Sequence, residues 1–504
     1  MSLTPAWALL VVFGLLVAYR RLARAQRGKL PPGPPADPIL GHLRTFPRDN
    51  HGETFYEWSK RYGDVLHLDL LGKSIIVLNS HEAANDLLDK RSANYSDRPD
   101  FPAFNLLGWD DMLVFQRYGS GFQLHRRLMQ QPLMRQEVAI FRPVQTQQCH
   151  VLLKNLLANP EDFEAHIRRF TSAITLEMTY GHKVASDDDA YLEIADQVNI
   201  VSTIMSKCSV LELFPSAKHL PAWFPGAWFI RYANEHRHLI WEMASKPFQQ
   251  VEEQLAAGTA QPSFVSMHLE DMERQGTRTD AATVAALKTA AAHMWTGGEE
   301  TTWSTLLIFM LAAVRNPEAV RAAQAELDAV LGPGPARLPA FEDLDALPLV
   351  RGVVYETLRF HSALPLGIPH RAMADDVYRD MHIPRDATVL VNTTALARDP
   401  AVYSAPERFW PERYQAPHSE PPPTGLGFGF GRRVCPGRHL AEASLCIVVA
   451  SVLAVFDVAP AKDAHGREVL PEVRFTQAIT SHPEPFKCRI APRSEQARRL
   501  VEDL

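Results

Sequence analysis

Most of the chain shows a helical pattern of hydrophobic and polar positions, and only two regions alternate as strands do. Runs of about 10–20 residues with apolar side chains three and four apart recur along the sequence, which is typical of amphipathic helices. Short alternating runs lie near residues 60–80 and 364–394 and predict a minor sheet. There is no internal repeat or heptad array. The pattern therefore predicts a mainly α fold with minor β structure.

The longest helical pattern covers residues 281–316 and has two adjacent glycines near its centre, at the start of Gly297–Thr302. Each glycine inside a helix costs roughly 1 kcal/mol relative to alanine. A kinked core helix is one interpretation. The functional hypothesis is that the missing side chains leave room for small ligands, while the Thr301 hydroxyl loosens the helix and relays protons together with Glu300.

The most specific chemical motif lies at residues 428–437, which read Phe-x-x-Gly-x-Arg-x-Cys-x-Gly and precede a long apolar helix. A buried cysteine after a glycine-rich turn is the simplest alternative, but five specified positions at fixed spacing argue against it. We interpret the loop as a cradle for haem with Cys435 as the axial ligand of the iron, since a thiolate ligand favours O–O cleavage. Gly431 and Gly437 let the backbone come close to a flat ligand. Phe428 can cover the sulfur, and Arg433 can bind a carboxylate of the ligand.

This loop resembles that of the cytochrome P450 monooxygenases, and the family's other motifs occur in the expected order. Glu356 and Arg359 form Glu-x-x-Arg, a spacing that places both charges on one helix face. Alone, the pair would be read as an ordinary surface ion pair. In the family a third arginine completes a buried network that holds the haem-side loop. We assign Arg413 to it, because only there does an aromatic residue stand two positions before the proline, and keep Arg408 as the alternate.

The resemblance also implies cationic partners for the haem propionates besides the arginine of the cysteine loop. Arg126 and Arg371 occupy two of the family's positions. Four residues before Arg126, where the family usually has tryptophan, this chain has Phe122, which has no indole N–H to donate. We expect haem to bind with one hydrogen bond fewer, or with His125 or Gln123 as a compensating donor.

The resemblance spans nearly the whole chain and implies a cytochrome P450 fold with one haem-binding domain and haem b as cofactor. The implied reaction inserts one oxygen atom into an apolar small molecule. The electrons would come from NADPH through a membrane-bound NADPH–cytochrome reductase, with cytochrome b5 as an optional second donor, because the chain has no flavin or dinucleotide fingerprint. No nucleic-acid partner is expected.

The phrases Leu366–Arg371 and Asp375–Tyr378 look closest to fungal microsomal members of secondary metabolism. Terpenoid, steroid and aromatic substrates all stay open. Two alternative functions also remain: a haem-thiolate isomerase or dehydratase that needs no reductase, and a non-catalytic, membrane-tethered haem-binding protein.

Residues 3–19 contain no charge and predict a membrane anchor. Five cations and no acids lie in the first thirty residues, so the remainder carries −11 against −6 for the whole chain. A cleaved signal peptide is the rival, but the positive charges follow the apolar run rather than precede it. We expect a transmembrane signal anchor at 1–29, a Pro-rich hinge at 30–50 and a catalytic domain at 51–504, held on the cytosolic face of the endoplasmic reticulum membrane.

Four further cysteines show no paired framework, which suits a cytosolic domain, and we expect buried thiols: Cys149, Cys208, Cys446 and Cys488. The aromatic segment 214–229 predicts either a second contact with lipid or packing against the body. Three further segments are candidate walls of a substrate pocket: Phe101–Leu113, Leu364–Ile368 and Ala478–Ile479.

Overall fold

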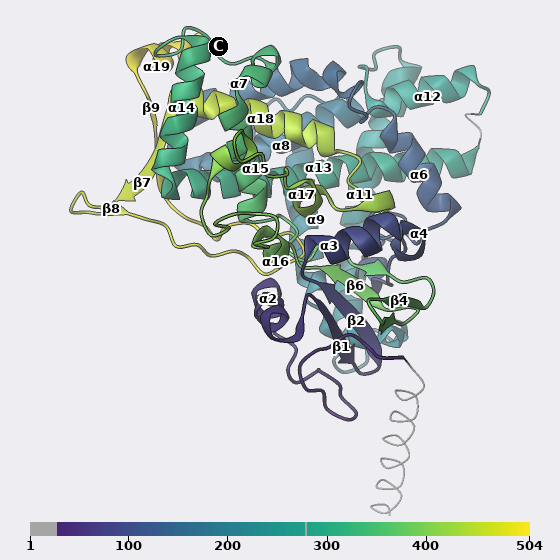
Figure 1. The fold of residues 1–504 in the computed structure, drawn as a ribbon. Coiled ribbons are helices and arrows are strands. Elements are labelled where there is room, and N and C mark those ends of the chain that lie inside the picture. The colour runs from purple at the N-terminus through teal and green to yellow at the C-terminus, as the bar shows by residue number, and fades with distance from the viewer. Residues whose placement is uncertain (1–27, 278–279) are drawn as a thin grey trace, which may run out of the picture. The chain divides into compact units, whose positions relative to one another are not determined.

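The computed structural model describes residues 28–277 and 280–504, and the chain divides into two compact units. The anchor expected at residues 1–29 lies almost entirely outside the described residues. Over the described residues, helices cover far more of the chain than strands do (Figure 1), so the prediction of a mainly α fold with minor β structure is confirmed. Each unit is described by itself below.

The smaller unit contains residues 28–100, 365–399 and 430–433. Its strands fall in the two regions where the sequence alternates: β1 (Val65–Leu70), β2 (Lys73–Leu78), β3 (His370–Arg371), β4 (Asp376–Tyr378), β5 (Met381–Ile383) and β6 (Thr388–Val391). Its helices are short: α2 (His51–Tyr62), α3 (His81–Ala84), η1 (Asn85–Lys90), α4 (Ser92–Tyr95), α16 (Thr393–Ala397) and η7 (Gly431–Arg433).

The main sheet of this unit has the order β1-β2-β6-β3, with β2 and β6 parallel and the other pairs antiparallel. Leu71 and Gly72 join β1 to β2 and both have positive φ, as a two-residue hairpin turn requires. Apolar residues of β1, β2 and β6 pack on Phe55 of α2, which is fully buried. Burial of this face holds the register of the strands.

The Pro-rich stretch at 30–50 is bound to this sheet rather than separate from it. The Pro32 carbonyl accepts a hydrogen bond from the His67 amide at 2.9 Å, and the His42 amide donates to the Asp69 carbonyl at 2.6 Å. The stretch predicted to be a hinge is therefore attached to the sheet of the smaller unit.

The larger unit contains residues 101–364, 400–429 and 434–504. Its helices before the central one are α5 (Pro102–Leu107), α6 (Ser120–Gln130), η2 (Val138–Phe141), α7 (Arg142–Ala158), η3 (Pro160–Asp162), α8 (Phe163–Tyr180), α9 (Ala190–Ser206), α10 (Ser209–Leu213), η4 (Pro215–His219), α11 (Trp228–Ala256) and α12 (Phe264–Arg274). The central helix and those that follow are α13 (Ala281–Arg315), α14 (Pro317–Leu331), η5 (Phe341–Ala346), α15 (Pro348–Phe360), η6 (Pro411–Tyr414), α17 (Thr424–Phe428), α18 (Arg438–Val455) and α19 (Glu495–Glu502).

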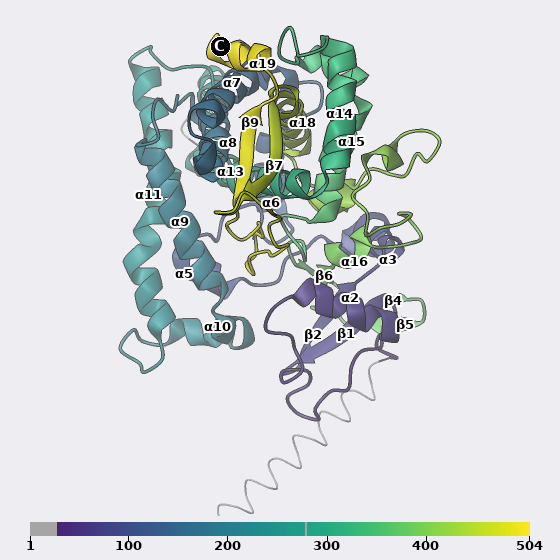
Figure 2. The same cartoon turned by 90° about the vertical axis from the view of Figure 1, so that its left-hand side faces the viewer.

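The larger unit also has a C-terminal sheet that the sequence pattern did not reveal. Its strands are β7 (Phe456–Lys462), β8 (Glu468–Val469) and β9 (Cys488–Pro492), with β7 antiparallel to both neighbours (Figure 2). β7 continues directly from α18, so the apolar run of the helix hides where the strand begins.

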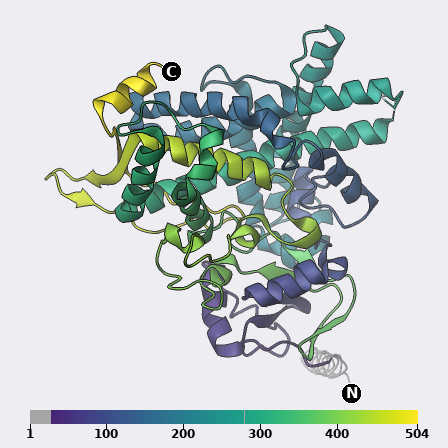
Figure 3. The same ribbon diagram turned by 45° about the horizontal axis from the view of Figure 1, so that its top comes forward.

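One hydrophobic core fills the larger unit. α13 packs along α8, and α18 packs on α7, α14 and α15, with α19 against α7 (Figure 3). Residues 302–314 of α13 are buried on all sides, so this part of the helix shows no polar face. Among the described residues, α18 is the one helix long and apolar enough to cross a membrane, but it is mostly buried within the protein.

The five cysteines are free thiols. Cys149, Cys208 and Cys446 are buried as predicted, whereas Cys488 is only half-buried because it lies in β9, which is paired on one side to β7.

Candidate active site

The cysteine loop joins α17 to α18, and Cys435 lies three residues before α18 begins. Gly429 ends α17 with φ at +75°, which favours glycine, and the Cys435 amide donates to the Phe428 carbonyl at 2.8 Å. Phe428 therefore fixes the loop through its backbone, and its ring is buried in the core. A Cβ at Gly437 would stand 3.9 Å from the Cys435 sulfur, which is ordinary van der Waals contact.

Burial raises the pKa of the Cys435 thiol and Glu442 adds to this rise, while one hydrogen bond and two positive charges oppose it. The Gly437 amide bonds the sulfur, and the charges of Arg126 and Arg438 favour the thiolate. The sulfur also lies near the N-terminus of α18, where the helix dipole favours negative charge. The surroundings of Cys435 are therefore suited to a thiolate ligand.

The two glycines of this motif differ in how far this structure requires glycine. Gly431 has φ at +54°, and a Cβ there would overlap the Leu88 carbonyl oxygen. Gly437 has φ at −84°, which any residue adopts, and a Cβ there would make only ordinary contacts. Its close approach to a flat ligand therefore stays a prediction.

Arg126 projects from α6 and donates to the Val434 carbonyl, next to Cys435, at 2.6 Å. Burial lowers its pKa, the Cys435 charge raises it and Arg438 lowers it. Among the described residues, no carboxylate lies within ion-pair distance of Arg126. The guanidinium is thus a half-buried cation available to an anionic ligand.

The other arginines predicted to bind propionates lie in the smaller unit. Arg433 is buried and its Nε donates to the Ser96 carbonyl at 2.7 Å. Arg371 already binds two carboxylates, Asp97 at 2.6 Å and Asp386 at 2.5 Å. Its role toward a propionate stays a prediction, and in this structure it neutralises these acids.

Sequence reasoning missed a second buried arginine of the smaller unit. Arg98 is 4% exposed and donates to the carbonyls of Ile368 and Pro369. Burial and then the charge of Arg433 lower its pKa, whereas Asp97 raises it. Burial, and then Arg98 and Arg433, lower the pKa of His370, so this ring stays uncharged beside the two guanidinium groups. A single Arg-Pro pair in a loop carries no spacing that could have revealed this.

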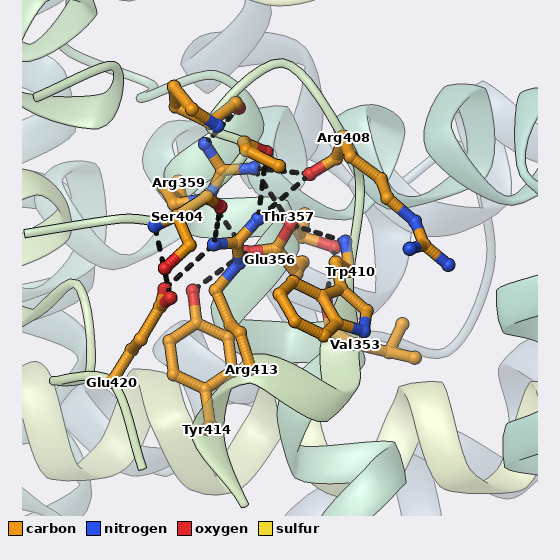
Figure 4. A network of polar contacts seen from close by, with 12 residues as sticks. Val353, Glu356, Thr357, Arg359, Ser404, Arg408, Trp410, Arg413, Tyr414 and Glu420 are labelled. Atoms are coloured by element: carbon orange, nitrogen blue, oxygen red, sulfur yellow. Dashed lines mark hydrogen bonds and ion pairs between the residues drawn. The ribbon is translucent and has the colours of Figure 1, made fainter. Parts of the chain in front are cut away.

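Glu356 is the centre of a buried polar network in the larger unit (Figure 4). Its Oε1 lies 2.6 Å from Arg359 Nε and 3.0 Å from Arg413 Nε, and it accepts a hydrogen bond from the Tyr414 hydroxyl at 2.8 Å. Its Oε2 accepts from Arg359 at 2.8 Å and from the Trp410 amide at 2.7 Å. The structure thus brings the three predicted residues together.

Arg413, rather than Arg408, supplies the second guanidinium. Arg413 is fully buried, whereas the Arg408 side chain is exposed and contributes only its backbone carbonyl, which accepts from Arg359 and Arg413 (Figure 4). Arg413 also pairs with Glu420 at 2.7 Å. Burial raises the pKa of Glu420, but hydrogen bonds from Arg413 and Ser404 lower it overall. Glu420 was missed because it lies in a Pro-rich connection without helical spacing.

On α13 the Thr301 hydroxyl donates to the Gly297 carbonyl at 2.7 Å. That carbonyl is the acceptor of the helical hydrogen bond from residue 301, so the hydroxyl competes with the helix there. Burial raises the pKa of Glu300, while Arg168 and a hydrogen bond from Thr480 lower it. The Glu300 carboxyl, whose pKa is raised, and the Thr301 hydroxyl are thus neighbours in sequence, close to the two glycines.

The two glycines of α13 differ in what they leave room for. A Cβ at Gly298 would lie 2.7 Å from the Thr175 methyl of α8, so this glycine permits the two helices to pack closely. A Cβ at Gly297 would meet only the His293 ring, at 3.7 Å. The expectation of open space therefore applies to Gly297 and is wrong for Gly298.

Glu299, which the sequence analysis passed over, is the most deeply buried acid of this segment at 1% exposure. Its carboxylate lies 3.7 Å from Arg168, which also pairs with Asp196 at 3.0 Å. Burial raises its pKa to about 7 despite Arg168. Two adjacent glutamates gave no sequence signal to show which one is buried.

The expected pocket walls are divided between the units. Phe101 and Phe104 are buried and pack on Phe115 at 4.9 and 4.6 Å between ring centroids, whereas Ile479 is 37% exposed. Residues 366–368 belong to the smaller unit. Their contact with a substrate stays a prediction.

The residues around Cys435 are compatible with haem. A single thiolate beside a half-buried arginine without a carboxylate partner among the described residues suits an iron porphyrin that carries propionates. Among the described residues, no group of three His, Cys, Asp or Glu side chains could hold a metal ion by itself. Within the larger unit, Cys435 and Arg126 would hold the group, and the role of Arg433 of the smaller unit stays a prediction.

Comparison with known proteins identifies the family. The family model described as Cytochrome P450 matches residues 31–489. Cytochrome P450 monooxygenase 176 of Postia placenta is 36% identical over 98% of this chain and 97% of its own length. A cytochrome P450 monooxygenase of Armillaria gallica is 38% identical over 97% of both chains, and claR of Ampulloclitocybe clavipes is 36% identical over 94% of this chain and 89% of its own. The chain therefore belongs to the cytochrome P450 family and is a cytochrome P450 monooxygenase.

Proposed function

We propose that this enzyme inserts one atom of dioxygen into an apolar small molecule, with electrons that an NADPH–cytochrome reductase delivers one at a time. Haem b bound through Cys435 supplies the oxygen-activating chemistry. Cytochrome b5 is a possible second electron donor. The relatives are fungal, which fits a role in fungal secondary metabolism. The substrate we propose is a terpenoid or aromatic skeleton.

The observation that carries the reaction type is the pairing of Thr301 with Gly297 beside Glu300. Thr301 keeps its hydroxyl at a fixed place by donating to the Gly297 carbonyl. Burial raises the pKa of Glu300, so its carboxyl keeps a proton to higher pH than an exposed glutamate does. Oxygen insertion consumes protons as well as electrons, whereas an isomerase or dehydratase needs no such supply from this position.

We further propose attachment to the endoplasmic reticulum membrane through the segment 1–29, with the catalytic part in the cytosol. The uncharged run at 3–19 and its basic flank support this. The segment 214–229 adds exposed aromatic side chains that suit a lipid interface: Phe214 at 53%, Trp223 at 79%, Phe224 at 41% and Trp228 at 42% exposure. Deletion of residues 1–28 should release part of the protein from membranes with haem still bound. Mature protein that begins near residue 26 would instead establish a cleaved signal.

The direct test is expression in microsomes with and without a reductase. An untargeted screen of terpenoid, steroid and aromatic candidates should find products that gain one oxygen atom only when NADPH and the reductase are present. Turnover without a reductase would support the isomerase or dehydratase function. Haem binding with no turnover of any candidate would support a non-catalytic binding protein.

A further inference from the structure

The outer face of α7 lines an open groove of the larger unit. Its volume is about 870 Å³, which lies in the range of small-molecule sites. The other walls are residues 338–342, which lead into η5, and the last turn of α19. The opposite face of α7, with Cys149, Leu152 and Leu156, is buried in the core. The groove contains none of the residues assigned above to haem or to the proton supply.

Much of the groove lining is apolar and only half-buried. From Arg142 to Lys154 the α7 wall is about 18 Å long, at roughly 1.5 Å per residue. Water in the groove lies against hydrocarbon side chains that an apolar ligand can cover. An elongated hydrocarbon chain therefore matches the shape of this lining. Its half-buried apolar side chains are Val151, Leu338, Phe341, Leu500 and Leu504.

The two ends of the α7 wall carry positive charge, although the chain as a whole carries −6. At one end Arg142 lies over the Phe341 ring at 5.1 Å and 3.8 Å from the Glu342 carboxylate. At the other end Lys154 is exposed, and no carboxylate of a side chain or of the chain end lies within ion-pair distance of it among the described residues. The end at Lys154 is therefore the one with an unbalanced cation.

His150 lies one turn before Lys154 on the same wall of the groove. Burial lowers its pKa, and the charge of Lys154 lowers it further. An anion bound beside these two side chains would balance the lysine and would also favour the protonated ring. The charges at this end thus complement a negatively charged head group.

We propose that this groove binds a free fatty acid, with its alkyl chain along the apolar lining and its carboxylate at Lys154. The opposite orientation is disfavoured, because Glu342 lies beside Arg142 and would repel the carboxylate. One unbalanced cation matches a head group with a single negative charge, and a single groove matches a single alkyl chain. The binding site is independent of the proposed reaction, since its residues take no part in the catalytic site.

The test is photolabelling of the holoenzyme with a dodecanoate that carries a diazirine on its alkyl chain. The full chain is held in phosphatidylcholine nanodiscs, which need no detergent. Mass spectrometry should find the label on peptides from α7 and residues 338–342, and unlabelled dodecanoate should compete for the site. Dodecanol, the uncharged match of the same length, should compete about 3- to 10-fold less well, because it lacks the attraction to Lys154.

Two charge reversals provide the matched comparison. Lys154→Glu should lower labelling of the groove about 3- to 10-fold, because it replaces attraction to the carboxylate by repulsion. Lys154 is exposed, so this variant should fold and bind haem as the wild type does. Lys183→Glu makes the same change at a lysine that is 64% exposed and lies outside the groove, and it should leave the labelling unchanged.

Three results would overturn the fatty-acid site. These are label confined to other parts of the chain, wild-type labelling of the groove in Lys154→Glu, and competition by dodecanol as strong as that by dodecanoate. Competition by dodecyl phosphate but not by dodecanoate would also overturn it, in favour of a phospholipid head group. The reduced carbon monoxide complex is recorded for each variant. A wild type without the red-shifted Soret band of thiolate ligation would refute the haem-thiolate assignment, whereas the labelling alone decides the groove.

Discussion

Removal of the Glu356 carboxylate should destabilise the larger unit strongly, because two buried guanidinium groups depend on it. In Glu356→Ala, Arg359 at 3% side-chain exposure loses both of its contacts with that carboxylate. Arg413, with a fully buried side chain, loses its 3.0 Å ion pair. The Tyr414 hydroxyl and the Trp410 amide lose their acceptor.

The magnitude follows from the buried charge left behind. Breaking a buried ion pair by removing one partner costs about 3–5 kcal/mol. Arg413 retains Glu420 at 2.7 Å, so the uncompensated charge is mainly that of Arg359. We therefore expect a loss within that range rather than twice its size.

The assay compares unfolding midpoints and the haem-loaded fraction of variants purified in parallel. Glu356→Ala and Arg413→Ala should both unfold earlier and accumulate little holoenzyme, because the network lies against the segment that leads into the cysteine loop. Arg408→Ala is the matched control. Its side chain is exposed, so its effect should stay within about 0.5 kcal/mol.

Two results would refute this reasoning. If Arg408→Ala were as damaging as Arg413→Ala, the assignment of Arg413 to the network would be wrong. An unchanged midpoint in Glu356→Ala would mean that burial of these charges adds nothing to stability.

Three further predictions concern the chemistry of the site. Cys435→Ala should abolish the red-shifted Soret band of the reduced carbon monoxide complex and Cys446→Ala should keep it; a band that survives in Cys435→Ala would overturn the ligand assignment. Thr301→Ala should still bind haem but should consume NADPH mainly without product and release peroxide, with a ~10²–10⁴-fold loss in the coupled step. If the amounts of product and peroxide per NADPH consumed are unchanged, Thr301 takes no part in supplying protons. Glu299 has its pKa raised from 4.5 to about 7, so the folded state keeps a proton that the unfolded chain releases, and stability should fall as the pH rises from 4.5 to 7. Glu299→Gln should raise the unfolding midpoint at pH 8 and flatten this dependence, and a midpoint below that of the wild type at pH 8 would contradict the buried proton.

Local chemistry allowed several features to be predicted from the sequence. The α13 helix, expected at 281–316, is found at Ala281–Arg315, because its pattern is long and Asp280 caps its start. Glu356 and Arg359 share a helix face by spacing alone, and the fixed spacing of the cysteine motif placed Cys435 before α18. Strands β1 and β2 were predictable because alternation with one turn between them is a local signal.

Other features depend on which residues meet across the fold, and no local pattern encodes that. β7 and β9 pair across residues far apart in sequence, and β7 follows α18 without a break in its apolar run. Gly298 is needed because Thr175 of another helix lies against it. The choice of Arg413 over Arg408 became certain only from burial, and Glu420 joins the network from a connection without pattern.

The sequence by itself determined the helical class, the cysteine motif and the family, since these rest on residue type and spacing along the chain. The tertiary structure alone decided which charged and polar groups are buried. Glu299, Arg98 and the His125 Nε2 look ordinary in the sequence, and their energetic importance arises only because packing removes water from them.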